Sequence, residues 1–243
     1  MINYQQLVRH LLKYSNRKIL IASTGTDIGK TFVAVKIIEN FLANNLKLDV
    51  IKPIASGVDL STIAGLANSD SGKILASLKR GVTLDNIREI SPWCFKEPVS
   101  PHLAASLNGV EITLQELSQF IDNRFILASN NGRQLIVESA GGIASPINRH
   151  HNFLDLAKQN KMPVILVVGN YLGSISHIVT MLWAIAYYEI EVASLLVNSN
   201  SNQEISHQNS QISNTDLLRF LQDFVDSHQQ IKAFFKDCLY CCN

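Results

Sequence analysis

Five short runs of apolar residues divide this chain. Each is a nearly continuous series of Val, Ile and Leu that ends in a small or polar residue. The runs are residues 18–23, 48–53, 134–139, 163–169 and 191–198. Continuous apolar strands are typical of parallel sheets, because helices cover both faces of such a sheet. The runs therefore predict five buried parallel strands.

The segments between the runs have apolar residues at helical spacing. They predict helices near 30–45, 71–80, 113–129, 152–160 and 174–188. Strands that alternate with helices indicate an α/β fold, in which helices flank a mostly parallel central sheet. A chain of 243 residues can bury a large core. We expect residues 1–243 to form a single α/β domain.

The two ends and one internal segment differ from this pattern. Residues 1–16 predict a short amphipathic helical extension. Residues 199–214 are rich in Ser, Asn and Gln and predict a mobile loop. Residues 215–243 have leucines and phenylalanines at three- and four-residue spacing, so we expect an atypical C-terminal helical segment, as one helix or a pair.

Composition narrows the range of partners. The net charge is +1, so no strong positive field favours nucleic acid or an anionic membrane. No apolar run approaches the roughly 20 residues that span a bilayer, and the N-terminus does not resemble a secretory signal. We expect a cytoplasmic protein that binds neither nucleic acid nor membrane. Its cysteines are expected to be reduced thiols without a metal: Cys94, Cys238, Cys241 and Cys242.

Ligands of parallel α/β sheets bind beyond the carboxyl ends of the strands. The segment after the first run, Ser23–Thr31, reads STGTDIGKT. Its Gly29-Lys30-Thr31 lies between a strand and a helix, where backbone N–H groups and the helix dipole attract phosphate. Lys30 would contact the β- and γ-phosphates, and the Thr31 hydroxyl would hold Mg²⁺. This loop indicates a P-loop NTPase fold.

Two further strand ends carry charged residues. Glu138, in ESAGG, is well placed to reach Mg²⁺ or a metal-bound water, although an acid there could also cap a helix. Lys52, in KPIASG, could stabilise negative charge on a transferred phosphoryl or carboxyl group. Taken alone, a lysine at this position is more often a surface residue that extends its ammonium into solvent.

The order of motifs along the chain is more specific than any one of them. STGTDIGKT, KPIASG, NSD (68–70), SPH (100–102), ESAGG and LGSISH (172–177) follow one another at compatible spacing. Together they resemble dethiobiotin synthetase, and the resemblance covers about residues 18–200.

This resemblance implies a Mg²⁺-dependent, ATP-driven ligase of biotin biosynthesis. Its substrates are 7,8-diaminopelargonic acid and CO₂. An amine and CO₂ form a carbamate, ATP converts the carbamate to a carbamic-phosphoric anhydride, and the second amine closes the ring of dethiobiotin. Such a site must hold an anion beside the γ-phosphate, which favours lysines and Mg²⁺.

The resemblance also assigns residues by position. Lys52 and Lys30 are the catalytic residues, and the Mg²⁺ ligands are Thr31, Asp70 and Glu138. Nucleotide binding is assigned to Asp27, Ile28, Gly29, Lys30, Thr31, Phe32, Asp70, Glu138, Ser139, Ala140, Gly141 and Asn198. Substrate binding is assigned to Thr26, Lys52, Ser56, Gly173, Ser174 and Ile175. The last three would come from the partner subunit and bind the tail carboxylate, which implies a homodimer.

The chain departs from the family at several positions. Ser23 stands where the family loop opens with glycine, and Gly25 stands where the family has an acid. We expect Gly25 to supply the backbone freedom that Ser23 lacks. The family's late Ile-Pro segment, which closes over the base, is absent because no proline follows Pro163. The preference for ATP over other nucleotides is therefore open.

Two other functions are compatible with the loop. A partitioning-type ATPase acting through a partner would normally carry a second lysine at the position of Gly25. A non-catalytic homologue would bind nucleotide without turnover. The motifs KPIASG, NSD and SPH favour a dethiobiotin synthetase over both of these alternatives.

Overall fold

The computed structural model of the chain describes residues 3–198 and 212–242. The loop predicted at 199–214 lies outside this part except for its last three residues. One sheet has the order β2-β5-β1-β6-β7-β8, with parallel pairing throughout. Its strands are β1 (Ile19–Ser23), β2 (Leu48–Ile51), β5 (Gln134–Glu138), β6 (Val164–Gly169), β7 (Val192–Asn198) and β8 (Leu239–Cys242). The predicted α/β fold and all five predicted strands are confirmed.

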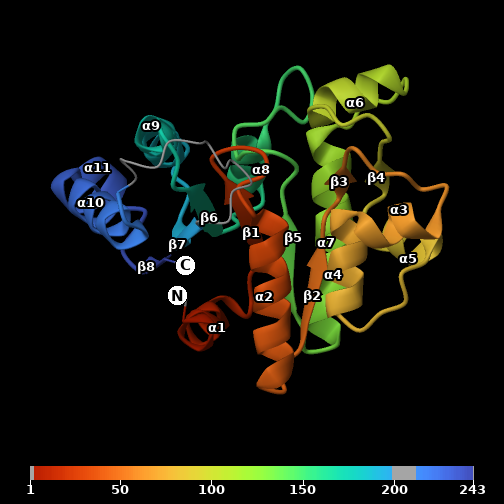
Figure 1. Ribbon diagram of the computed structural model, residues 1–243, viewed down its shortest axis with the longest axis horizontal. Coiled ribbons are helices and arrows are strands. Elements are labelled where there is room, and N and C mark those ends of the chain that lie inside the picture. Colours follow the sequence, from red (N-terminus) through yellow and green to blue (C-terminus); the bar gives the residue numbers. More distant parts are fainter. Residues whose placement is uncertain (1–2, 199–211, 243) are drawn as a thin grey trace.

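Helices surround this sheet (Figure 1). The five that were predicted are α2 (Lys30–Ala43), α4 (Asp70–Ser77), α7 (Leu114–Asn130), α8 (Phe153–Gln159) and α9 (Ser174–Tyr187). Three short helices were not predicted: α3 (Ile63–Asn68), α5 (Leu84–Ile90) and α6 (Pro101–Leu107). Each has only six or seven residues, fewer than two full turns, which is too short for a periodic signal to stand out.

The chain reverses direction across the sheet after β2. Right-handed connections then place α2 on one face and α7, α8 and α9 on the other. The loop after β1 therefore leaves toward the opposite face from the loops after its neighbours β5 and β6. A cavity opens next to this point, beyond the carboxyl ends of β1, β2 and β5.

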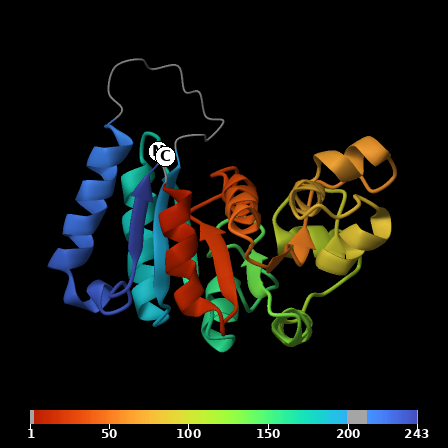
Figure 2. The same cartoon turned by 90° about the horizontal axis from the view of Figure 1, so that it is seen from below.

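The N-terminal extension is part of the core. Helix α1 (Tyr4–Leu11) continues into a 3₁₀ turn, η1 (Leu12–Tyr14), and its Leu7 and Leu11 are fully buried. It lies beside α2 in both views (Figures 1 and 2). The His10 ring also reaches β7, where its Nε2 lies 2.8 Å from the carbonyl oxygen of Ala193.

The prediction of a helical segment over 215–243 is wrong at its end. Two helices form as expected, α10 (Asn214–Ser227) and α11 (Gln229–Lys232), but the chain then turns and forms β8 beside β7. The sequence of β8, LYCC, is apolar and short. The free edge of β7 offers it backbone hydrogen-bond partners that a short helix would not have, since the last turn of a helix leaves carbonyl groups unpaired.

A second, two-stranded sheet lies away from the main one. Its strands, β3 (Ile54–Ala55) and β4 (Trp93–Cys94), are parallel and too short to predict from periodicity. The Phe95 N–H donates to the carbonyl oxygen of Ala55 at 2.8 Å. The segment leading to SPH thereby holds the KPIASG turn in place. Figures 1 and 2 show α3, α5 and α6 grouped at this end of the molecule, away from α10 and α11.

Candidate active site

The phosphate loop connects β1 to α2. Its backbone is left-handed at Asp27, with φ 57°, and at Gly29, with φ 95°. Ser23 is instead a regular residue of β1, and Gly25 has no left-handed φ. The expectation that Gly25 supplies conformational freedom is therefore wrong. The tight turn that requires a left-handed backbone comes later, immediately before the helix.

Gly29 is also required for space. A Cβ atom at this position would lie 2.1 Å from Nδ2 of Asn198. The Asn198 side chain is fully buried at the end of β7, and its Nδ2 donates to the carbonyl oxygen of Ile28 at 2.9 Å. The structure thus places Asn198 beneath the loop, and its predicted contact with a base stays a prediction.

Lys30 points back into the loop. Its Nζ donates to Oγ of Ser23 at 3.0 Å and to the carbonyl oxygen of Gly25 at 3.3 Å. Burial, and after it the neighbouring charge of Lys52, lower the pKa of Lys30 to about 8 against the opposing effect of nearby carboxylates. The amine therefore lies at the base of the loop, next to the start of α2.

The second lysine, Lys52, is surrounded by acids. It follows β2, is 6% exposed, and donates from Nζ to Asp70 and, at 2.8 Å, to Oε1 of Glu138. Burial lowers the pKa of Lys52, but the two carboxylates outweigh burial and raise it above the ordinary value. For Asp70 the signs are reversed. Burial raises the pKa of this carboxyl group, but the charge of Lys52 outweighs burial and lowers the pKa below its ordinary value.

Three oxygen-bearing side chains meet at this point. Glu138 ends β5, Asp70 begins α4, and the Thr31 hydroxyl donates to Oε1 of Glu138 at 2.6 Å. Oε2 of Glu138 is buried and has no hydrogen-bond partner among the described residues. Carboxylate and hydroxyl oxygens are the ligands that Mg²⁺ prefers. The donor set and this unpaired oxygen fit a magnesium ion.

These groups open into one cavity of about 660 Å³. Most residues predicted for the site line it: Thr26, Asp27, Gly29, Lys30, Thr31, Phe32, Lys52, Ser56, Asp70, Glu138, Ala140 and Gly141. The remaining ones do not line it: Ile28, Ser139, Asn198, Gly173, Ser174 and Ile175. Ser139 is fully buried, and its Oγ donates to the carbonyl oxygen of Gly141 at 3.2 Å.

Gly173, Ser174 and Ile175 lie apart from this cavity, at the start of α9. Gly173 has φ 88° and precedes the helix, Ser174 is buried, and Ile175 is 37% exposed. The structure does not bring this segment together with Lys52 within one chain. Its predicted role toward a neighbouring subunit stays a prediction.

Sequence comparison shows which known proteins this chain resembles. The AAA domain family matches residues 17–236. The ATP-dependent dethiobiotin synthetase BioD of Legionella pneumophila (strain Paris) is 38% identical over 161 residues, which cover 66% of this chain and 70% of that protein.

The chain belongs to the ATP-dependent dethiobiotin synthetase family.

Two other members of this family show the same relationship. The enzyme of Methylobacterium nodulans is 31% identical, covering 74% of this chain and 80% of its own. That of Phenylobacterium zucineum is 34% identical, covering 77% and 78%. Among solved structures, the signal recognition particle receptor FtsY of Elizabethkingia anophelis is only distantly similar, with a TM-score of 0.39 and 14% identity over 82% of this chain and 57% of its own. The resemblance inferred from the motifs is confirmed.

Several of the residues that line the first cavity were not predicted from the sequence. Ser100 and Pro101 belong to the quoted SPH motif, but no role was assigned to them. Lys73 lies three residues after Asp70 on α4, so helical spacing alone could have placed it on the same face. Val99 and Ser145 carry no chemical signal in the sequence, since only the fold brings their loops to the cavity.

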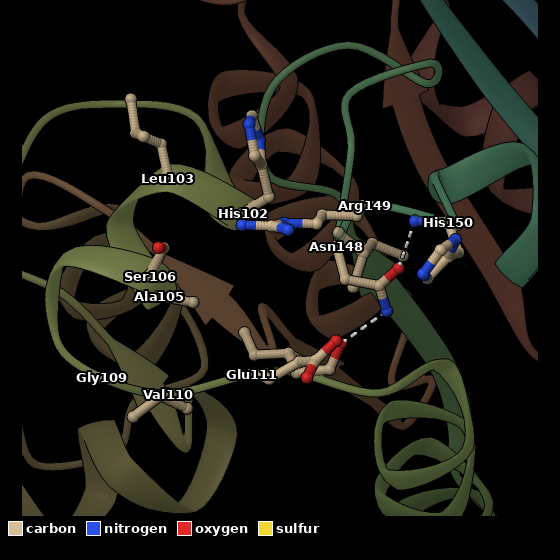
Figure 3. A pocket seen from close by; sticks show the side chains of 12 residues that line it. His102, Leu103, Ala105, Ser106, Gly109, Val110, Glu111, Asn148, Arg149 and His150 are labelled. Carbon is tan, nitrogen blue, oxygen red and sulfur yellow. Dashed lines mark hydrogen bonds between the residues drawn. The ribbon is translucent and has the colours of Figure 1, made fainter.

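The structure also has a cavity of about 720 Å³ beside α6. It is bounded by α6, residues 109–112 and residues 147–150. Arg149 points from its loop toward α6, and Asn148 donates to the carbonyl oxygen of Ile112 at 2.8 Å (Figure 3). None of the residues predicted for the site lines this cavity.

A helix must be long and predominantly apolar to cross a bilayer. Within residues 3–198 and 212–242, no helix is both long enough and apolar enough to do so.

Proposed function

We propose that this chain is a dethiobiotin synthetase that uses a nucleoside triphosphate and Mg²⁺ to carboxylate and cyclise 7,8-diaminopelargonic acid. The observation that supports this best is the position of Lys52. Its buried ammonium lies against Asp70 and Glu138, directly beside the phosphate loop and in the same cavity as Ser56. A nucleotide phosphate and an anionic substrate can therefore meet at one lysine.

The nucleotide side of the proposal rests on the loop and the start of α2. The first N–H groups of a helix have no partner within the helix and attract phosphate oxygens, as does the ammonium of Lys30. Mg²⁺, held by Thr31, Asp70 and Glu138, would neutralise charge on the β- and γ-phosphates. Phe32 is 36% exposed beside the cavity, and Asn198 supports the loop from below.

The substrate side rests on the KPIASG turn and Thr26. One amine of the diamine attacks CO₂ and loses a proton, which gives a carbamate. A carbamate oxygen then attacks the γ-phosphorus and displaces the nucleoside diphosphate. The second amine attacks the carbamoyl carbon, loses a proton, closes the ureido ring and displaces inorganic phosphate. We assign to Lys52 the stabilisation of the anionic carbamate next to the γ-phosphate, and to Ser56 and Thr26 the binding of the substrate.

The tail carboxylate of the substrate is assigned to a second copy of the chain. Gly173, Ser174 and Ile175 precede or begin α9, a helix of 14 residues. Its first N–H groups suit a carboxylate. Because this segment does not line the cavity of its own chain, the proposal includes a homodimer whose subunits complete each other's sites.

A direct assay tests this function. Purified protein is incubated with 7,8-diaminopelargonic acid, bicarbonate, Mg²⁺ and each nucleoside triphosphate, and dethiobiotin is measured by mass spectrometry. We expect product, and its yield with each nucleotide gives the preference. Lys52→Ala should abolish product formation. Lys47→Ala is its matched control and should leave the yield unchanged, because Lys47 is an exposed lysine that precedes β2 whereas Lys52 follows it.

Failure of the assay has two distinguishable forms. Nucleotide hydrolysis without dethiobiotin would favour the partitioning-type ATPase. Nucleotide binding without any turnover would favour the non-catalytic homologue. Either result contradicts the proposal.

A further inference from the structure

Ser23 makes an unusual contact for the last residue of a strand. Its side chain is fully buried, and Oγ donates to the carbonyl oxygen of Gly25 at 2.5 Å. The same oxygen accepts a hydrogen bond from Nζ of Lys30 at 3.0 Å. One hydroxyl therefore connects the beginning of the phosphate loop to the lysine at its end.

The chemistry of these bonds fixes their direction. A serine hydroxyl has one proton, and here it goes to Gly25. The lone pairs of Oγ therefore face Lys30, which must donate. The carbonyl oxygen of Gly25 faces the same ammonium at 3.3 Å. Two acceptors thus hold the ammonium in one place.

The backbone of Ser23 is held in turn by its neighbours. Its carbonyl oxygen accepts from the N–H of Ile143 at 2.7 Å, and the N–H of Thr24 donates to the carbonyl oxygen of Val167 at 3.3 Å. These bonds come from the loop after β5 and from β6. The backbone that carries the hydroxyl is therefore held rigidly, which is necessary for a residue that orients another side chain.

We propose that Ser23 is a positioning residue for nucleotide binding: its hydroxyl holds the Lys30 ammonium at the base of the phosphate loop, ready for the β- and γ-phosphates. The inference rests on the nucleotide-binding part of the proposed function and not on the carboxylation. Glycine, which the family loop carries at this position, has no atom that could make this contact.

A double-mutant cycle separates this role from a purely structural one. ATP affinity is measured by calorimetry in the presence of Mg²⁺ for the parent, Ser23→Ala, Lys30→Met and the double variant. We expect Ser23→Ala to weaken ATP binding about tenfold, the effect of losing a hydrogen bond to a charged group. In the Lys30→Met background the same change should alter ATP affinity by less than about twofold, because the group it acts through is gone.

Two further variants control for folding and for chemistry. Ser194→Ala removes another fully buried strand serine, whose Oγ donates to the carbonyl oxygen of Leu239 at 2.6 Å, and should leave ATP affinity unchanged. Ser23→Gly removes the same hydroxyl as Ser23→Ala and should show the same loss, so the test survives if one variant folds poorly. In turnover, both Ser23 variants should raise KM for ATP more than they lower kcat.

Equal losses from Ser23→Ala in both backgrounds would overturn the inference, since Ser23 would then act on the loop and not through Lys30. Unchanged ATP affinity in Ser23→Ala would overturn it as well. A parent protein that binds ATP but makes no dethiobiotin contradicts the proposed reaction and leaves this cycle measurable.

Discussion

Nζ of Lys52 lies 2.8 Å from Oε1 of Glu138, and the carboxylate is fully buried. Each charge compensates for the burial of the other. A buried charge that loses its partner costs about 3–5 kcal/mol, whereas removal of both partners together can be nearly neutral. This pair therefore couples the stability of the fold to the chemistry of the site.

Lys52→Met should abolish turnover. Methionine retains most of the side-chain volume but has no charge to place beside a carbamate or a γ-phosphate, so we expect kcat to fall by at least about a thousandfold. The free energy of unfolding should also fall by a few kcal/mol, because Glu138 keeps a buried charge. Dethiobiotin production and urea unfolding measure the two effects.

The double variant Lys52→Met/Glu138→Gln separates the loss of turnover from the loss of stability. It should recover much of the lost stability while staying inactive, because the buried charge has been removed and the lysine is still missing. Recovery of activity in the double variant, or retained activity in Lys52→Met, would show that Lys52 does not have the assigned role.

Asn198→Ala should weaken nucleotide binding even though Asn198 does not line the cavity. The change removes the donor to the carbonyl oxygen of Ile28 and leaves space behind Gly29. We expect about a tenfold higher Kd for ATP, in line with loss of a buried hydrogen bond. Asn131→Ala is the control, since that amide donates to the carbonyl oxygen of Leu127 at 2.7 Å on the exposed end of α7. Equal affinities in both variants would contradict the supporting role.

Gly29→Ala should disrupt the loop more than backbone strain alone explains. Gly132→Ala provides the comparison, because Gly132 also has a positive φ, 61°, but has open space around its Cβ position. We expect Gly132→Ala to lower the free energy of unfolding by about 1 kcal/mol and to keep ATP binding. Gly29→Ala should cost clearly more and lose ATP binding, as measured by unfolding and calorimetry. Similar costs at the two positions would show that the contact with Asn198 is unimportant.

The docking of α1 should respond to pH through His10. Burial lowers the pKa of His10, and Lys13 lowers it too, against the opposing effects of its bond to Ala193 and of Asp237. Because the folded pKa is below the unfolded value of about 6.5, the neutral ring stabilises the fold fully above that pH. The stabilisation is lost as the pH falls from about 6.5 through the folded pKa.

Urea unfolding at pH 7.5 and at pH 5.5 checks this. The loss of stability between these values should be smaller in His10→Gln, whose amide can still donate to Ala193 but does not titrate. His150→Gln, at an exposed loop position, should keep the pH dependence of the parent. An identical pH dependence in His10→Gln would exclude His10 as the cause.

The main strands and helices follow from local patterns because burial on both faces of a parallel sheet demands unbroken apolar runs. The same patterns did not predict β8, since an edge strand forms only when a neighbour such as β7 offers a free edge. They also missed β3 and β4, whose two residues each cannot show a period. Motif order identified the family, because the residues to which we assign the chemistry follow the strand ends in sequence.

The residue types of the site were thus readable from the chain: a loop for phosphate, a lysine after one strand and a glutamate after another. Their relationships were not. Only folding brings Lys52, Asp70 and Glu138 within hydrogen-bonding reach, and only folding places Asn198 against Gly29 and Ser23 against Lys30. The physical reason is that sequence patterns report which face of an element is buried, whereas contacts between side chains depend on the register and direction in which distant elements pack.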